Sequence, residues 1–88
     1  MHYVYILKSQ KNGKLYKGCT DDIKKRIAKH NQGKVRSTKL SRPWKLIYYE
    51  GFINKTDALR EELFLESGKG KERLKYLLKN TLEEWQSG

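Results

Sequence analysis

The chain has 88 residues, which is enough for one compact domain and too few for two, because two cores would have too little apolar surface to bury. Hydrophobic residues make up 36% and charged residues 34%, so we expect a thin core and a highly charged surface. One cysteine, Cys19, and two histidines exclude an internal disulfide and a zinc cluster. We therefore expect a single domain over residues 1–88, in which any metal is held by carboxylate and water.

Positive charge is concentrated in the first half of the chain. The formal net charge is +10, with 13 basic and 2 acidic residues in 1–45 but 7 basic and 8 acidic in 46–88. Such a one-sided field attracts polyanions and gains from counterion release on a phosphate backbone. No segment approaches the roughly 20 apolar residues of a spanning helix, and residues 1–10 lack a signal-peptide pattern. We therefore expect a cytoplasmic nucleic-acid-binding protein without membrane contact, the alternative being a merely soluble basic protein.

The first elements in chain order form a predicted β-hairpin. Residues 3–7 are a β-branched and aromatic run, and the Asn-Gly pair at 12–13 is the strongest short hairpin signal, so residues 15–19 should return antiparallel. A two-residue loop would pair Lys11 with Lys14 and place Ser9 opposite Tyr16. Tyr5 and Tyr16 then share a face but lie about four positions, or roughly 13 Å, apart, unless the side chains lean together or a bulge shifts them.

A helix and a basic loop follow. Thr20 or Asp21 is the expected N-cap, and Gly33 is the expected end of the helix. Arg26 and His30 are neighbours on it, one turn apart, and reach past the edge of the sheet. The loop over residues 34–43 interleaves cations with hydroxyl groups, a composition suited to phosphate contacts. Its cations are Lys34, Arg36, Lys39 and Arg42.

The second half is predicted to be a strand and two helices. Residues 44–53 form the third strand, and Asn54 caps a helix that ends at Gly68. A last helix from about Lys71 places one apolar stripe against the core, made of Leu74, Leu77, Leu78, Leu82 and Trp85. The exposed end of this stripe at Trp85 leaves a structural or interaction role open.

Two carboxylates fall on the apolar arc of the helix that follows Asn54. Around the helix axis, at about 100° per residue and counted from Ala58, Glu62 lies near 40° and Glu66 near 80°. A carboxylate that faces a core is costly unless it is paired or holds a cation. A salt bridge to a neighbouring Arg or Lys is the ordinary explanation, and geometry alone does not choose between the two residues.

Five residues stand out as candidates for chemistry, and each has a structural alternative. A tyrosine in a strand is more often a packing residue, and an Arg or His on a helix surface is usually solvated. The candidates are Tyr5, Tyr16, Arg26, His30 and Glu62.

The spacing of these residues resembles the GIY-YIG nuclease superfamily, specifically its short stand-alone, UPF0213-like members. Tyr3-Val4-Tyr5 stands at the first signature tripeptide and Tyr16-Lys17-Gly18 at the second. The run from 22 to 31 is similar to the helix of the catalytic arginine and its accompanying histidine, and Glu62 matches the metal-binding glutamate. Similar segments at 42–50 and 67–71 extend the resemblance over nearly the whole chain.

The resemblance implies an α/β (α+β) fold in the order β-β-α-β-α-α. This is a small three-stranded antiparallel sheet, with the first strand central, flanked by about three helices. The implied function is metal-dependent endonucleolytic hydrolysis of DNA phosphodiester bonds, structure-specific or repair-related. The alternative is a catalytically weak nucleic-acid-binding module that keeps the fold.

The resemblance also implies a role for each site residue. Glu62 would hold one divalent cation, Mg²⁺ or alternatively Mn²⁺, and Arg26 would bind the scissile phosphate. One tyrosine would deprotonate the attacking water, with Tyr5 preferred, and the other would orient it, while His30 would act as a relay or phosphate ligand. Lys17 and the cations of the 34–42 loop would bind flanking backbone of duplex or branched DNA.

Overall fold

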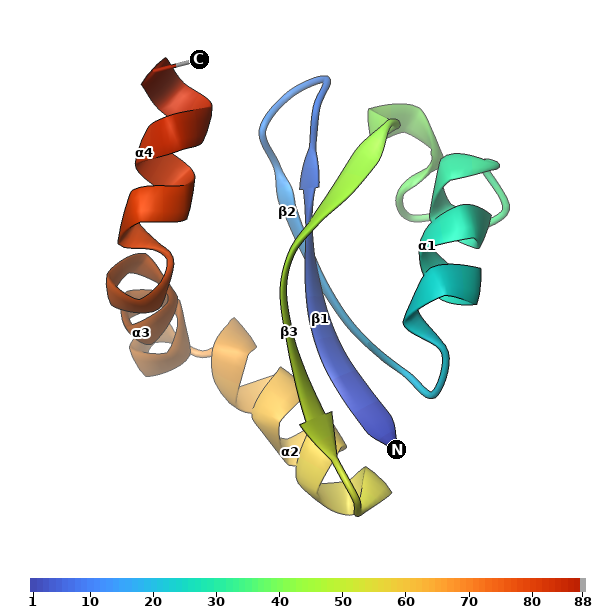
Figure 1. Ribbon diagram of the computed structural model, residues 1–88, viewed down its shortest axis with the longest axis vertical. Helices are drawn as coiled ribbons and strands as arrows, with labels where there is room; N and C mark the ends of the chain where they lie inside the picture. The colour runs from blue at the N-terminus through green and yellow to red at the C-terminus, as the bar shows by residue number, and fades with distance from the viewer. Residues whose placement is uncertain (88) are drawn as a thin grey trace.

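The protein folds as a three-stranded antiparallel sheet with helices on both faces (Figure 1). This computed structural model describes the backbone of residues 1–87 and the side chains of residues 1–83. The strands are β1 (His2–Ser9), β2 (Leu15–Thr20) and β3 (Trp44–Phe52), in the spatial order β2-β1-β3. The helices are α1 (Ile23–Asn31), α2 (Lys55–Glu66), α3 (Gly68–Leu77) and α4 (Lys79–Ser87), with a short 3₁₀ helix η1 (Lys39–Ser41). The predicted α/β class, antiparallel sheet and central first strand are confirmed.

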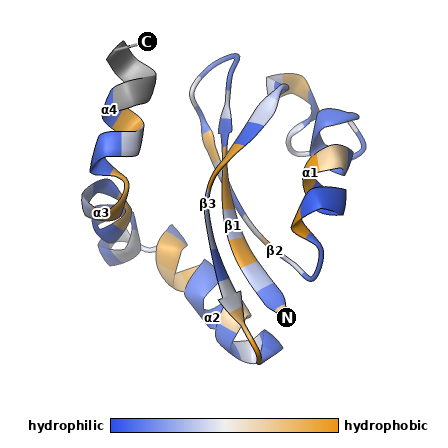
Figure 2. Cartoon of the chain, in the orientation of Figure 1, coloured by the Kyte–Doolittle hydropathy of each residue, from blue (hydrophilic) through white to orange (hydrophobic). Residues whose placement is uncertain are grey.

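Strand β1 is buried on both faces, because its alternate side chains enter two separate cores. Val4 and Ile6 pack with residues of α2 and α3, including Leu65. Tyr5 and Leu7 enter the second core, on the α1 side. Successive side chains of a strand point to opposite faces, so one apolar run supplies both layers. Figure 2 shows hydrophobic stretches along the strands and mixed hydropathy on the helices.

The β1–β2 hairpin has a longer loop than expected. A two-residue loop at 12–13, with Ser9 opposite Tyr16, is wrong. The strands close at Ser9 and Lys14, where the backbone N···O distance is 2.8 Å, and residues 10–13 form the loop. The Ser9 hydroxyl explains the difference, since it accepts hydrogen bonds from two backbone amides of the loop and so supports a wider turn.

The hairpin loop is also tied to the segment that precedes β3. The Ser9 hydroxyl donates to the carbonyl of Ser41 at 2.6 Å, and the Lys11 ammonium donates to the carbonyl of Leu40 at 3.0 Å. The side-chain amide of Asn12 donates to the Ser41 hydroxyl at 3.0 Å. Two loops about 30 residues apart in sequence therefore form one unit at the end of the sheet that carries the hairpin tip (Figure 1).

The corrected register brings the two signature tyrosines together. Gly18 lies opposite Tyr5 and Tyr16 lies opposite Leu7, so the tyrosines are two positions apart instead of four. Two positions correspond to about 6.6 Å along a strand. The centroids of the two rings are 6.3 Å apart, and no bulge in β2 is needed.

Helix α1 begins later than expected and is fastened to β3. Neither Thr20 nor Asp21 is the N-cap, because β2 continues through Thr20. The cap is Asp22, whose Oδ1 accepts from the backbone N–H of Lys25 at 3.1 Å.

The C-terminal end of α1 lies where the sequence predicts. Gly33 takes a φ of 76°, which suits the residue after a helix. The side chain of Asn31 clasps the backbone of Trp44: its amide donates to the carbonyl at 3.0 Å and its oxygen accepts from the N–H at 2.7 Å. These two hydrogen bonds fix the position of α1 against the start of β3.

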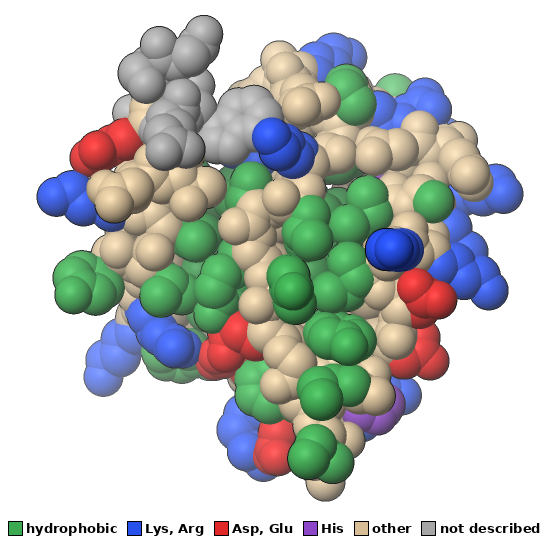
Figure 3. Space-filling view, viewed as in Figure 1, with side chains coloured by type: hydrophobic (Ala, Val, Ile, Leu, Met, Phe, Trp, Pro, Cys, Tyr) green, Lys and Arg blue, Asp and Glu red, His purple; other side chains and the backbone are tan. Residues whose placement is uncertain are grey.

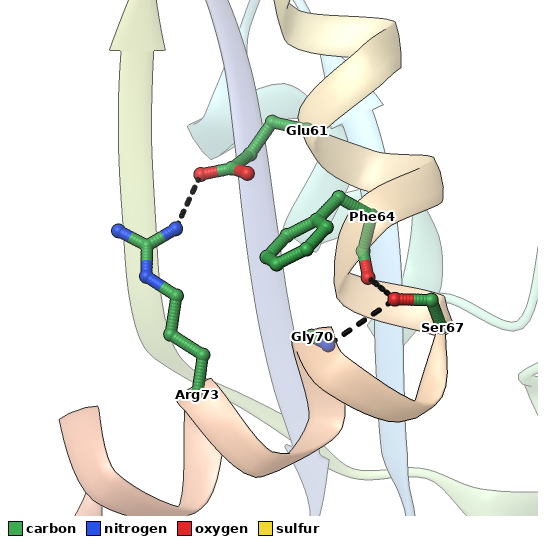
Figure 4. Close-up of polar contacts among 5 residues, drawn as sticks. All are labelled: Glu61, Phe64, Ser67, Gly70 and Arg73. Atoms are coloured by element: carbon green, nitrogen blue, oxygen red, sulfur yellow. Dashed lines mark hydrogen bonds and ion pairs between the residues drawn. The ribbon is translucent and has the colours of Figure 1, made fainter.

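Helix α2 has the predicted cap but a different end. Asn54 accepts from the backbone N–H of Thr56 at 2.8 Å, as expected of an N-cap. Gly68 does not end this helix, because it is the first residue of α3. Ser67 lies between the two helices, where its hydroxyl donates to the carbonyl of Phe64 and accepts from the N–H of Gly70 (Figure 4).

The predicted last helix is divided in two at Leu78, which has a non-helical backbone conformation. Leu74 and Leu78 are buried and Leu82 packs against the same core, as the stripe predicts. Leu77 is instead largely exposed. The side chain of Trp85 lies outside the described residues.

The molecular surface separates apolar and basic regions. In Figure 3, hydrophobic side chains gather over the centre of the face, where β3 lies, and many Lys and Arg side chains lie around the right-hand edge, over α1 and the loop after it. Within residues 1–87, no helix has the length and apolar character needed to cross a membrane.

Gly70→Ala is expected to lower the free energy of unfolding by about 2–3 kcal/mol. A β carbon at this residue would overlap the carbonyl oxygen of Phe64 and lie 2.6 Å from Cα of Leu65, so α3 would have to move away from α2. Urea denaturation followed by circular dichroism measures the change. Gly68→Ala is the matched control, because a β carbon there meets nothing within 4 Å. Equal stabilities of the two variants would contradict the predicted close approach.

Candidate functional site

The hydroxyl of Tyr5 is the centre of a polar cluster on the α1 face of the sheet. The Tyr5 side chain is 1% exposed. Its oxygen lies 2.9 Å from Nε2 of His30, and Nε of Arg26 donates to it at 3.4 Å. Burial raises the pKa of Tyr5, against a smaller lowering effect of the Arg26 hydrogen bond. The phenol is therefore protonated at neutral pH.

The hydrogen bonds continue beyond His30 and have one direction. His30 Nδ1 lies 2.7 Å from the hydroxyl of Thr38, which donates its single proton to the carbonyl of Val35 at 3.4 Å. Because Arg26 only donates, the Tyr5 hydroxyl donates to Nε2 of His30, and Nδ1 then carries the ring proton and donates to Thr38. A carbonyl only accepts and the Arg26 guanidinium only donates, so both ends of the chain impose the same direction.

Thr38 is held in place by the core. It is 1% exposed, and the indole N–H of Trp44 donates to its carbonyl at 2.9 Å. Its hydroxyl is therefore unavailable to phosphate, contrary to the interpretation of this loop from composition. Instead, Thr38 orients the imidazole of His30 from the side opposite Tyr5.

His30 is neutral in the folded protein. It is 0% exposed, and burial, together with the positive charge of Arg26, lowers its pKa to about 4. The expectation of a histidine that reaches past the sheet edge is wrong, because the ring fills the space between β1 and the loop after α1. The neutral imidazole is oriented to accept a hydrogen bond from Tyr5, while its lowered pKa disfavours full protonation in the unliganded protein.

Tyr16 lies beside this chain of hydrogen bonds and is more open than Tyr5. Its ring centroid is 4.9 Å from that of His30 and 6.3 Å from that of Trp44, both with edge-to-face geometry. Gly18 leaves room for the neighbouring phenol, since a β carbon there would lie 2.5 Å from Cζ of Tyr5. The glycine of the second signature tripeptide therefore has a steric reason.

Glu62 is a half-buried carboxylate without an ion pair among the described residues. Burial raises its pKa, and the charge of Glu66 raises it further. The salt bridges near it use other residues, and Arg73 pairs with Glu61 at 3.1 Å (Figure 4). The salt-bridge explanation of Glu62 thus has no support in the structure, and Glu66 is exposed.

Electrostatic coupling connects Glu62 to the tyrosine cluster. After burial, which is the largest cause, the Glu62 carboxylate adds to the raised pKa of Cys19 and, more weakly, to that of Tyr5. The side chains of Arg26 and Cys19 both line a hollow at the protein surface. The hollow is therefore bordered by Arg26 and lies within the electrostatic reach of Glu62.

The predicted phosphate-binding cations are not all near this cluster. Lys17 lies between Tyr16 and Gly18 on β2, so its side chain points to the other face of the sheet. The loop cations follow the C-terminal end of α1 and are exposed, and Nε of Arg42 donates to the carbonyl of Lys39 at 2.6 Å. These loop cations are Lys34, Arg36, Lys39 and Arg42.

Comparison with known proteins identifies the family. The profile of the GIY-YIG catalytic domain matches residues 1–76. The chain belongs to the GIY-YIG family. Its resemblance to the stand-alone, UPF0213 members of that family is likewise confirmed.

Several relatives match over most of their length. A UPF0213 protein of Staphylococcus saprophyticus is 43% identical over 77 residues, which cover 86% of this chain and 93% of that protein. A UPF0213 protein of Clostridium perfringens is 36% identical over 85 residues, which cover 96% of this chain and 90% of that protein. The solution NMR structure of the UPF0213 protein BH0048 from Bacillus halodurans is 38% identical, with a TM-score of 0.53 over 86% of this chain and 83% of that one.

Within this GIY-YIG domain, the structure brings Tyr5, Arg26 and His30 into direct hydrogen-bonded contact and adds a residue that sequence reasoning missed. Thr38 lies in a basic loop whose composition gives no signal of burial. Trp44, six residues later, is the residue that contacts Thr38, but the sequence alone does not predict this contact.

The stability of the protein is expected to depend on pH through His30. Its pKa is about 4 when folded and 6.5 ordinarily, so the unfolded chain binds a proton between these values and the folded chain does not. The free energy of unfolding should therefore fall as pH decreases from 6.5 to 4, with a contribution from His30 of up to about 3 kcal/mol.

The His30 contribution is isolated by comparison with His30→Gln, which keeps an acceptor near the position of Nε2. Denaturation curves of both proteins at several pH values give the difference in stability. The advantage of the wild type should shrink as pH falls through this interval, while carboxylates titrate in both proteins and cancel. A difference independent of pH would contradict the buried neutral histidine.

Proposed function

We propose that residues 1–88 form a single cytoplasmic endonuclease domain that hydrolyses DNA phosphodiester bonds with the aid of a divalent cation. GIY-YIG domains act on DNA and generally use such a cation. The observation that supports this function most directly is the hydrogen-bonded contact of Tyr5 with Arg26 and His30, together with the unpaired carboxylate of Glu62, whose charge acts on Tyr5. A module that only binds nucleic acid has no need of a buried hydroxyl at Tyr5, because an apolar side chain there would require neither partner.

Glu62 fits the role of a cation ligand. Its carboxylate is half-buried, carries a raised pKa and is close to a second carboxylate, Glu66. A positive ion would relieve both the burial cost and the repulsion. Mg²⁺ prefers oxygen ligands and keeps several waters, so one protein carboxylate with water and phosphate oxygens suits it, with Mn²⁺ as the alternative. When bound, the cation stabilises negative charge that develops on the phosphate oxygens.

Arg26 is suited to hold the scissile phosphate. Its guanidinium is anchored at Nε by Tyr5, and it lines the open hollow. The hydrogen bond to Tyr5 is the largest cause that raises its pKa, so the group stays charged. A fixed cation at the reacting phosphate stabilises the additional charge of the pentacovalent transition state.

The direction of the hydrogen bonds gives a path for the proton of the attacking water. Tyr5 takes this proton while its own passes to Nε2 of His30. The water oxygen bonds to phosphorus, the bond to the leaving oxygen breaks, and that oxygen takes a proton from solvent. Burial is the larger cause of the low pKa of His30 and the charge of Arg26 the smaller; a phosphate bound at Arg26 would offset this smaller effect and raise the pKa of His30 in part. Tyr16 would orient the water.

Substitution of the site residues is expected to abolish cleavage of supercoiled plasmid or branched DNA with Mg²⁺ or Mn²⁺. Arg26→Ala removes the phosphate contact and Tyr5→Phe removes the base, and each should reduce the rate about 100-fold or more. Binding to the same DNA, measured without the cation, should remain close to wild type for Tyr5→Phe.

Glu62→Gln tests the cation ligand at nearly constant shape. Cleavage should be lost at low cation concentration, whereas Glu66→Gln, the matched control on the next turn of α2, should retain most of the rate. Undiminished cleavage by Glu62→Gln would refute the assignment of the ligand. A wild type that binds every DNA tried and cuts none would favour the alternative of a nucleic-acid-binding module.

A further inference from the structure

A second group of cations surrounds the hollow beside Arg26. The hollow has a volume of about 420 Å³ and lies between the end of β2 and the first turns of α1 and α2. In Figure 1 this is the end of the sheet where the N-terminus lies, opposite the hairpin tip. Its lining includes Cys19, Lys25, Arg26, Lys29, Lys55 and Leu59.

The charge on the walls of the hollow favours an anion. Three lysines join Arg26 there, and none of the three has an ion pair among the described residues. Asp21 and Asp22 also line the hollow, but Asp22 is engaged as the cap of α1. Four cations and two carboxylates line the hollow, so four minus two leaves its lining with a net charge of +2.

The arrangement of these lysines follows from the two helices. Lys25 and Lys29 are one turn apart on α1 and lie on either side of Arg26 in sequence. Lys55 and Glu62 are seven residues apart on α2, so they lie on nearly the same side of it, about 10 Å apart along the axis. Lys55 thus extends the site away from Glu62 toward the N-terminal end of α2, while Lys25 and Lys29 flank Arg26 on α1.

We infer that this hollow binds the phosphate backbone of the nucleic-acid strand next to the scissile phosphate, through Lys25, Lys29 and Lys55. The inference rests on the proposed function and specifies the direction in which the bound strand runs from the scissile phosphate. A strand that contacts Arg26 passes between Lys25 and Lys29 into the hollow, toward Lys55 at the N-terminal end of α2. At a rise of about 3.4 Å per nucleotide, the 10 Å between Glu62 and Lys55 corresponds to about three nucleotides.

The basic loop after α1 is a less favourable place for these first contacts. It lies beyond His30, at the other end of the helix, and the Nε–H of Arg42 is already bonded to the chain itself. The hollow, in contrast, shares Arg26 with the reacting site. The loop then contacts backbone farther along the DNA.

The test measures binding of a 20-base-pair duplex over a range of salt concentrations, without a divalent cation. The variant combines Lys25→Gln, Lys29→Gln and Lys55→Gln. Each lysine that contacts phosphate should reduce the slope of log affinity against log salt by about 1, so we expect a reduction of about 2–3. Glutamine keeps the helix propensity, and circular dichroism checks the fold.

The matched control combines Lys69→Gln, Lys71→Gln and Lys75→Gln on α3, which lies on the opposite side of the sheet from α1 and does not line the hollow (Figure 1). It removes the same charge, so its slope should stay close to wild type. Equal slopes for the two triple variants would overturn the inference, because only general charge would then matter. An adjacent phosphate site also predicts that cleavage by the first variant shows a raised KM with little change in kcat.

The binding readout separates this inference from the proposed function. A wild type that binds DNA without cutting it, together with a reduced slope for the hollow variant, would refute the nuclease and support the phosphate site. Cleavage by the wild type, with unchanged slope and KM in the hollow variant, would support the nuclease and refute the phosphate site. Absence of any binding by the wild type would refute both.

Discussion

Burial of the Tyr5 hydroxyl beneath α1 imposes a requirement that much of the structure serves. A phenol oxygen without partners in a core costs free energy, so it must find a donor and an acceptor there. Arg26 and His30 fill these roles, and His30 in turn requires Thr38. Thr38 is fixed by Trp44 at the start of β3. Packing of the sheet and alignment of the reactive groups are therefore parts of one network.

The fold was largely predictable, because its strongest patterns are local. The apolar run of β1, the cap at Asn54 and the stripe of Leu74 and Leu78 each report on nearby residues, and the structure agrees with them. The hairpin register and the N-cap of α1 were not predictable. Both depend on competition between side chains, such as the Ser9 hydroxyl against the Asn-Gly turn, and on where a strand stops pairing with its neighbour.

The candidate site was predictable in its members but not in its contacts. Family spacing selects Tyr5, Arg26 and His30, yet it does not indicate that His30 is buried and neutral. That state follows from burial and from the charge of Arg26, and the ring is oriented by Thr38, eight residues away in a loop whose composition suggests exposure. The surplus of positive charge in the first half of the chain was predictable from the sequence. Its division into two groups, one at the hollow and one in the loop after α1, follows from three-dimensional packing. Lys55, from the near-neutral second half, joins the hollow for the same reason.

The bonds between the hairpin loop and the segment before β3 affect how the protein meets a ligand. They hold the backbone at Leu40 and Ser41, between the cations Lys39 and Arg42, before any nucleic acid arrives. Ordering a flexible residue costs about 1–2 kcal/mol. Since folding has already ordered this segment, association does not lose that freedom a second time. For the proposed binding of nucleic acid, the hairpin tip, which carries none of the candidate site residues, would therefore contribute to affinity through rigidity.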